Sequence, residues 1–274
     1  MDELYILARR VLLNALDALG EHRDAVVLVG AQAIYVRVGD GDLAEVAPFT
    51  TDGDLVLDPR RLKEIPPLER AMLESGFVQK DIGIWLAREQ RSDNLLVDVT
   101  VDLLSPDALS PGSGTRKASL VGHEAGAARK TPGLECALVD HDVVSLVALE
   151  ASDPRSRNVR VAGPAALLVS KAKKIADRVG TRRLKDKDAL DVLRLLRGTT
   201  TADVAARYQQ LLDDGVSEAL AREALSLLKT QFAERRAVGV DMAVRATAAL
   251  VDEEQVRASC TILANDLLDA LAGR

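Results

Sequence analysis

The sequence predicts an α+β protein, in which a small mixed sheet with helices is followed by a helical region. Short runs rich in β-branched residues are spread over the first 162 residues, as expected for buried strands. From Gly163-Pro164 to the C-terminus the apolar residues instead recur at helical spacing, and proline suits the first turn of a helix. We therefore expect a mixed domain over residues 1–162 and a helical domain over residues 163–274.

The first domain is expected to begin with an amphipathic helix over residues 2–20, whose apolar residues recur three and four apart. A buried strand follows at 25–29 and ends at Gly30, where a tight turn leads into a helix at 31–36. Breaks in the second domain are expected at Gly180, Gly198, Gly215 and Gly239. The other expected elements of the first domain are strands at 54–57, 82–88, 94–104, 119–121, 138–139 and 159–161 and a helix at 68–75.

Composition indicates a globular protein of a reducing cytoplasm. Hydrophobic residues make up 47% of the chain and charged residues 28%, which is typical of globular domains. No apolar run reaches the roughly 18 residues of a membrane span, so we expect no membrane contact. The chain starts with acidic residues and has only two cysteines, which argues against a secretory signal, a disulfide framework and a zinc site.

Positive charge is concentrated in one part of an otherwise acidic chain. The net charge is −6, yet residues 155–197 contain thirteen Lys and Arg against four Asp and Glu. This asymmetry predicts a face that meets an anion such as a nucleotide or RNA. A solvated helix face explains the charge equally well.

Two aspartates at the start of a predicted strand form the first candidate site. Asp52 and Asp54 are two residues apart, so in a strand both carboxylates point to the same side. Such neighbours repel each other unless a cation lies with them, and Mg²⁺ prefers oxygen ligands of this kind. The pair therefore predicts a Mg²⁺ site, although Asp52-Gly53-Asp54 alone also fits a simple turn.

A third carboxylate is expected from the apolar strand at 94–104. Asp98 and Asp102 interrupt this run and, being four apart, lie on one face of it. A buried carboxylate without a partner is costly, so one of the two is expected to face the metal. Asp102, close to the end of the strand, is the preferred candidate. Asp98, or a solvent-facing position for both, is the alternative.

A basic stripe marks the first helix of the second domain. Lys171, Lys174 and Arg178 recur at helical spacing and so lie along one side of the helix. Facing the carboxylates, they would bind the phosphates of a nucleotide and offset charge in the transition state. Asp188 and Asp191, one turn apart, are expected to hold Lys171 or Arg178 in place, or to fix the base of the following helix. A solvated charged helix is the alternative interpretation.

Together these segments resemble the nucleotidyltransferase superfamily that shares its core with DNA polymerase β. Within it, the chain looks most like the AbiEii-type nucleotidyltransferases, known as toxins of toxin–antitoxin systems. The resemblance runs from about residue 25 to residue 196 and depends on the order of the motifs, since none is specific alone. The motifs are Val29-Gly30-Ala31-Gln32-Ala33, Thr50-Thr51-Asp52-Gly53-Asp54-Leu55, and Lys171, Arg178, Lys187-Asp188 and Asp191.

The resemblance implies a nucleotidyltransferase fold for residues 1–162 and a role for each motif residue. Asp52 and Asp54 would hold Mg²⁺ on the phosphates of an NTP, and Asp102 or Asp98 would hold a second ion. The remaining nucleotide contacts that it implies are Gly30 and the N–H of Ala31 at the triphosphate, the hydroxyl of Thr51, and Lys171, Lys174 and Arg178 on phosphates, with Asp188 and Asp191 in support.

The activity implied is transfer of NMP from an NTP to an acceptor, with tRNA as the family-based choice and an antitoxin protein as a further partner. Two alternatives stay open. One is the same chemistry on a protein or on a small molecule such as an aminoglycoside, and the other is a degenerate fold that only binds. Asp52, Asp54 and Lys171 speak against the degenerate form, whereas Ala31, where the family often has Gly or Ser, leaves it open.

Overall fold

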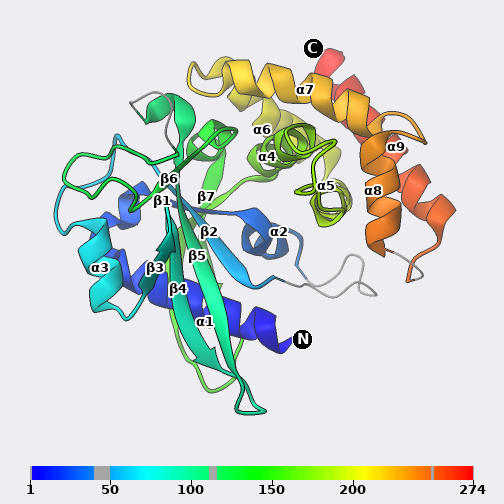
Figure 1. The fold of residues 1–274 in the computed structure, drawn as a ribbon. Coiled ribbons are helices and arrows are strands. Elements are labelled where there is room, and N and C mark those ends of the chain that lie inside the picture. Colours follow the sequence, from blue (N-terminus) through cyan, green and yellow to red (C-terminus); the bar gives the residue numbers. More distant parts are fainter. Residues whose placement is uncertain (1, 40–49, 111–115, 248–249, 274) are drawn as a thin grey trace. The chain divides into compact units, whose positions relative to one another are not determined.

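The computed structural model describes residues 2–39, 50–110, 116–247 and 250–273, and its elements confirm the expected α+β class (Figure 1). The chain separates into two compact units, Met1–Ala33 with Pro48–Ala162 and Ile34–Ala47 with Gly163–Arg274. The first unit contains the sheet, and the second is built from helices. Across the described ranges, none of the helices combines the length and the apolar character that crossing a membrane requires.

Eight strands in the described residues form one mixed sheet, in the order β3-β4-β5-β2-β1-β8-β7, with β6 added beside β5. The pairs β1–β8, β2–β5 and β5–β6 are parallel, and the other neighbours are antiparallel. All four residues of β1 are buried, which is why this inner strand is entirely apolar. The strands are β1 (Val26–Val29), β2 (Asp52–Leu57), β3 (Val78–Asp81), β4 (Ile84–Gln90), β5 (Leu96–Pro106), β6 (Arg129–Thr131), β7 (His141–Val147) and β8 (Ser156–Ala162).

Helix α1 (Glu3–Ala18) packs on one face of the sheet, in contact with β2 and β5. Asp2 caps the helix, since its carboxylate accepts hydrogen bonds from the N–H groups of Leu4 and Tyr5. Leu12 of α1 lies over Gly53, where a Cβ would come within 3.2 Å of it. Because successive residues of a strand alternate, Asp52 and Asp54 point to the face opposite α1.

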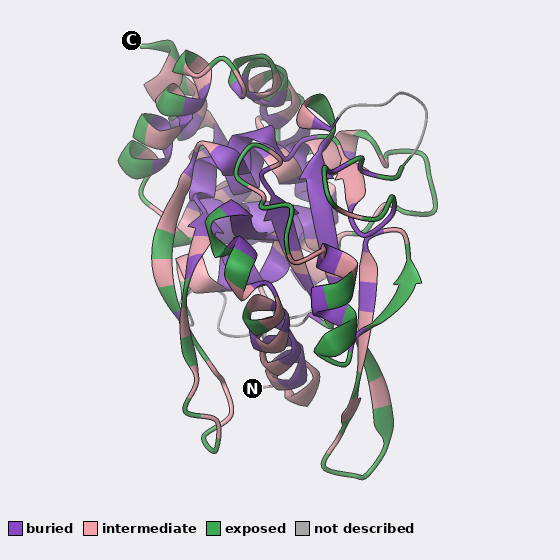
Figure 2. Cartoon of the chain, turned by 90° about the vertical axis from the view of Figure 1, so that its left-hand side faces the viewer, coloured by how far each residue is buried: buried purple, intermediate pink, exposed green. Residues whose placement is uncertain are grey.

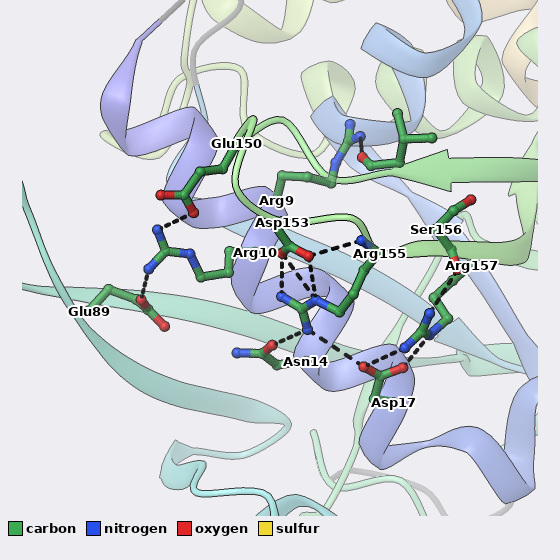
Figure 3. A network of polar contacts seen from close by, with 11 residues as sticks. Arg9, Arg10, Asn14, Asp17, Glu89, Glu150, Asp153, Arg155, Ser156 and Arg157 are labelled. Carbon is green, nitrogen blue, oxygen red and sulfur yellow. Dashed lines mark hydrogen bonds and ion pairs between the residues drawn. The ribbon is translucent and has the colours of Figure 1, made fainter.

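The polar side of α1 ties the β7–β8 hairpin to the sheet (Figure 3). Arg10 forms ion pairs with Glu89 of β4 at 2.9 Å and with Glu150, between β7 and β8, at 2.6 Å. Asp17 pairs with Arg157 of β8 at 2.5 Å. Figure 2 shows the buried residues concentrated in the body of the sheet, with exposed residues towards the tips of the β4–β5 and β7–β8 hairpins.

The second unit is a set of helices around an aliphatic core. Helix α4 contacts α5, α6 and α7, and its first turn begins with Pro164 directly after Gly163. Thr200 and Asp252 cap α6 and α9 with their side chains. The helices that complete the fold are α2 (Gly30–Val38), α3 (Leu68–Glu74), α4 (Pro164–Ala176), α5 (Lys187–Gly198), α6 (Thr201–Asp213), α7 (Glu218–Phe232), α8 (Val238–Thr247) and α9 (Glu253–Ala272).

Several expected elements differ from those observed. The strand expected at 119–121 is absent from these described residues, and the strand expected at 138–139 is wrong because Glu135–Leu138 is a 3₁₀ turn. Strands β3, β6 and β7 were not expected. The break expected at Gly239 is also wrong, because Gly239 lies inside α8. A Cβ there would come within 2.5 Å of the Phe232 ring, so helix packing explains this glycine.

Candidate functional site

Parallel pairing of β2 with β5 brings two of the predicted carboxylates side by side. Asp54 is the register partner of Asp102, and Asp52 is the register partner of Thr100. On its other side Asp54 is paired with Val29, the last residue of β1. The face of the sheet opposite α1 therefore carries Asp52, Asp54 and Asp102, close to the turn from β1 into α2.

Gly30 makes room for the carboxylate of Asp54. Its φ of +70° is in the left-handed region, and a Cβ built there would lie 2.0 Å from Oδ2 of Asp54. Because α2 starts at Gly30, the Asp54 carboxylate lies at a helix N-terminus, where negative charge is favoured. Glycine was predicted here for the approach of a triphosphate, and the structure adds a second reason, the position of Asp54.

Asp52 is held by a buried chain of side chains. The Thr50 hydroxyl donates to Oδ1 of Asp52 at 2.5 Å, and the Gln32 amide donates to its backbone carbonyl at 3.2 Å. The Gln32 oxygen in turn accepts from Nε of Arg9 at 2.8 Å. Arg9 and Gln32 are almost fully buried, and Arg9 also donates to the backbone carbonyl of Val147. The start of β2 is thereby bonded to both α1 and α2.

Asp102 has a cationic neighbour within the same unit. Nη2 of Arg129 on β6 lies 2.6 Å from Oδ2 of Asp102, and both side chains are less than one-fifth exposed. Arg129 is placed there because β6 pairs with β5, opposite Leu104. This short, charge-assisted contact offsets part of the charge of Asp102.

Asp98, the alternative third carboxylate, lies away from this group. It is four residues before Asp102 on β5 and forms an exposed ion pair with Arg88 at 3.2 Å. Ala31 is buried in the first turn of α2, and Thr51 is exposed. The predicted contacts of Ala31 and Thr51 with a nucleotide stay predictions.

Asp52 and Asp54 fit Mg²⁺ as a pair of carboxylate ligands. Mg²⁺ is commonly held by one or two carboxylates, with water and phosphate oxygens completing its shell. The Asp54 carboxylate occupies the space that a Cβ at Gly30 would otherwise fill. Among the described residues, no three or more His, Cys, Asp or Glu side chains gather into a group able to hold a metal ion. Asp102, the register partner of Asp54, lies against Arg129.

The basic stripe of the second unit is built around a buried ion-pair network. Nζ of Lys171 lies 2.9 Å from Oδ1 of Asp188 and 2.7 Å from Oδ2 of Asp191, and all three side chains are buried. Lys174 and Arg178 pair with the same Asp188 at 3.1 Å and 3.6 Å, and both are partly exposed. The structure thus pairs Lys171 with Asp188 and Asp191, and the predicted contact of Lys171 with phosphates stays a prediction.

This network shifts the pKa values of its members in opposite directions. Burial acts to raise the pKa of Asp188, but Lys171 and Lys174 outweigh it and lower the pKa to about 2. Burial acts to lower the pKa of Lys171, but Asp191 and Asp188 outweigh it and raise the pKa above its usual range. Asp188 and Lys171 are therefore both charged at neutral pH.

The free energy of unfolding should decrease as the pH is lowered below about 4, because Asp188 becomes protonated. Its pKa is lower in the folded chain than the ordinary 3.8, so its contribution is present above that value and is lost as pH falls to about 2. The shift corresponds to about 2 kcal/mol in the free energy of unfolding. Urea unfolding of wild type and Asp188→Asn across this range checks it. The gap between the two proteins should shrink as pH falls, and a constant gap would contradict the assignment.

Four residues of the site were not predicted from the sequence: Arg9, Gln32, Thr50 and Arg129. Arg9 had a usable signal, because it is a charged residue on the apolar side of the first helix. Arg129 had none, since its approach to Asp102 depends on the pairing of a strand that was itself unexpected.

Comparison with known proteins finds similarity at the level of structure. No protein-family model matches the chain, and no curated protein matches it. The fold is similar to the crystal structure of an antigenic nucleotidyltransferase-like protein from Paracoccidioides brasiliensis, at a TM-score of 0.48 and 16% sequence identity. The similarity covers 89% of this chain and 93% of that one.

Proposed function

We propose that this chain is a Mg²⁺-dependent nucleotidyltransferase whose metal-binding residues are Asp52 and Asp54. One observation carries the proposal. Two carboxylates project from one face of β2, directly beside the glycine turn into α2, with a third carboxylate in register on β5. Asp52 and Asp54 would hold Mg²⁺, and the ion when bound would supply positive charge that stabilises the phosphates of an NTP during transfer.

The chain's own residues would orient the reactants. Thr50 and Gln32 hold Asp52 in place by hydrogen bonds. Gly30, which has no side chain, leaves room for the Asp54 carboxylate. Within the second unit, Lys174 and Arg178 are the more accessible cations of the basic stripe. We assign contacts of this stripe with phosphate to these two, with Lys171 as the buried residue that organises Asp188 and Asp191.

The acceptor is proposed to be RNA, with tRNA first, because the sequence motifs resemble those of the AbiEii-type toxins. On the same ground, an antitoxin protein is the proposed partner. NMP transfer to a protein or to an aminoglycoside-like molecule uses the same carboxylates and is the second candidate. Incubation with each labelled NTP and separate pools of tRNA, protein and aminoglycoside identifies the acceptor. Labelling of no pool would favour the degenerate, binding-only form.

Asp52→Asn should lower NMP transfer by at least about a hundredfold, because it removes one of the two anionic metal ligands. The change keeps the shape of the side chain and an oxygen for Thr50 to bond. Asp24→Asn is the matched control, since Asp24 is 78% exposed and pairs only loosely with Arg160 in the same unit. Rates measured with labelled NTP and the identified acceptor check the prediction. If Asp52→Asn transferred NMP at the wild-type rate, Asp52 would not be an active-site residue.

A further inference from the structure

Arg9 is a buried cation whose hydrogen-bond acceptors are all uncharged. It belongs to the buried side of α1, and only 3% of it is exposed. Its guanidinium donates to the side-chain oxygen of Gln32 at 2.8 Å, to the carbonyl of Val147 at 3.0 Å and to the hydroxyl of Tyr5 at 3.1 Å. Burial lowers the pKa of Arg9, and no carboxylate in the described part of the chain counters this. A buried cation without a counter-ion costs free energy on folding, so stability alone does not account for an arginine here.

The guanidinium of Arg9 fixes which end of the Gln32 amide faces Asp52. Arginine has N–H donors and no acceptor, so it can bind only the oxygen of that amide. The NH₂ group of Gln32 therefore points the other way, where it donates to the backbone carbonyl of Asp52 at 3.2 Å. The positive charge polarises the amide and strengthens its bond to Asp52. Arg9 thus sets the direction of a hydrogen-bond chain that ends at Asp52.

Gln32 bonds β2 at a point that β1 does not reach. The last register pair of β1 and β2 is Val29 with Asp54, because the protein backbone then turns into α2. Asp52 lies two residues beyond that end of the pairing, and Gln32 from the first turn of α2 bonds its carbonyl. The carboxylate of Asp52 is fixed separately, by the hydroxyl of Thr50. The bond from Gln32 therefore supports the backbone of Asp52 where β1 gives no pairing.

Resting on the proposed function, we propose that Arg9 is a positioning residue for the metal ligand Asp52 and acts through the amide of Gln32. Arg9 orients Gln32, and Gln32 holds the start of β2. The carboxylate of Asp52 is thereby kept in place before any ion binds. Groups that hold a metal ligand in this way raise metal affinity, because less ordering is left to occur on binding.

The next residue of the same helix, Arg10, provides a matched comparison. Its guanidinium pairs with Glu89 at 2.9 Å and with Glu150 at 2.6 Å (Figure 3). Neither pair belongs to the hydrogen-bond chain that ends at Asp52. Arg10→Met therefore removes the same charge from α1, and two ion pairs with it, but should leave the binding of a metal ion at Asp52 unchanged.

Titration with Mn²⁺ in the absence of nucleotide, with free Mn²⁺ measured by electron paramagnetic resonance, reports on Asp52 without catalysis. Gln32→Met should weaken Mn²⁺ binding about tenfold, and Arg9→Met should weaken it as well. Loss of a positive charge alone would strengthen the binding of a cation, so weaker binding in Arg9→Met reports position and not charge. Arg9→Lys keeps a charged donor for Gln32 and should bind Mn²⁺ more tightly than Arg9→Met does.

A double-mutant cycle tests whether Arg9 acts through Gln32. Arg9→Met combined with Gln32→Met should bind Mn²⁺ as Gln32→Met alone does, because Arg9 then has no amide to orient. Circular dichroism and urea unfolding establish that each variant is folded and how stable it is. Arg9→Gln takes the place of Arg9→Met if that variant does not fold, since a glutamine both donates and accepts and so loses the fixed direction.

The outcomes separate this inference from the proposed function. Unchanged or tighter Mn²⁺ binding in folded Arg9→Met, or no gain in Arg9→Lys over Arg9→Met, would overturn the role of Arg9 and leave the metal site in place. Losses that multiply in the double variant would show that Arg9 does not act through Gln32. An equal loss in Arg10→Met would assign the effect to a general loosening of α1 and would also overturn the inference. No Mn²⁺ binding in wild type would overturn the metal site of the proposed function, and the role of Arg9 with it.

Discussion

Replacing Lys171 by methionine should lower the free energy of unfolding by about 3–5 kcal/mol, which is the usual cost of breaking a buried ion pair. The buried Nζ of Lys171 donates hydrogen bonds to both Asp188 and Asp191, at 2.9 Å and 2.7 Å. Methionine fills a similar volume but leaves both carboxylates short of a cation in a buried site. Asp188 keeps the partly exposed Lys174 at 3.1 Å and Arg178 at 3.6 Å, and Asp191 keeps Arg194 at 3.8 Å.

Lys173→Met is the matched control for this change, because Lys173 lies on the same helix and also pairs with two carboxylates. Its pairs with Glu223 and Asp177 lie at the surface, so its loss should cost at most about 1 kcal/mol. Urea unfolding of both variants at neutral pH measures the difference. Adding Asp188→Asn to Lys171→Met should recover part of the loss, since one of the unpaired charges is removed. A loss in Lys171→Met no larger than in Lys173→Met would contradict the buried network.

A structural role for Lys171 changes how the basic stripe is interpreted. Helical spacing placed Lys171, Lys174 and Arg178 on one side of a helix, and all three do converge on Asp188. Spacing could not tell which of them is buried, because burial depends on how α5 packs against α4. The Asp-x-x-Asp pattern contained the missing information, since two acidic residues on the buried side of α5 require a buried cation.

Much of the fold follows from local patterns in the sequence. The strand at 26–29, the glycine turn and the helix after it follow from a short apolar run, and Gly163-Pro164 marks the start of α4. Strands with polar or exposed residues were missed: every residue of β3 is exposed, so it has no apolar alternation to detect. Strand β7 was missed for a similar reason, because as an edge strand it keeps Val143, Ser145 and Val147 exposed.

In the candidate site, too, some features follow from local sequence patterns and others depend on tertiary packing. The side that Asp52 and Asp54 share follows from strand alternation, which is a local rule. The neighbourhood of Asp102 does not, because it depends on parallel pairing between β2 and β5 and on β6 joining the other side of β5. The Arg9–Gln32–Asp52 chain joins three separate elements and likewise depends on tertiary packing.

Replacing Gly30 by alanine should lower NMP transfer on the order of a hundredfold, because a small displacement of a catalytic group is costly. The new Cβ would lie 2.0 Å from Oδ2 of Asp54. The Asp54 carboxylate would therefore have to move out of the place in which it can bind a metal ion together with Asp52. Alanine is also strained at a φ of +70°, at a cost of about 1–2 kcal/mol in stability. Mn²⁺ affinity should fall together with activity, since the displaced group is a proposed metal ligand.

Gly76→Ala separates the strain from the displacement. Gly76 has a similar φ of +86°, yet no atom lies within 4 Å of a Cβ built there. This variant should therefore lose about the same stability as Gly30→Ala while keeping its Mn²⁺ affinity and its rate of transfer. Equal loss of activity in the two variants would assign the effect to general destabilisation. Full Mn²⁺ affinity in folded Gly30→Ala would show instead that Asp54 is not a metal ligand, whatever the rate of transfer.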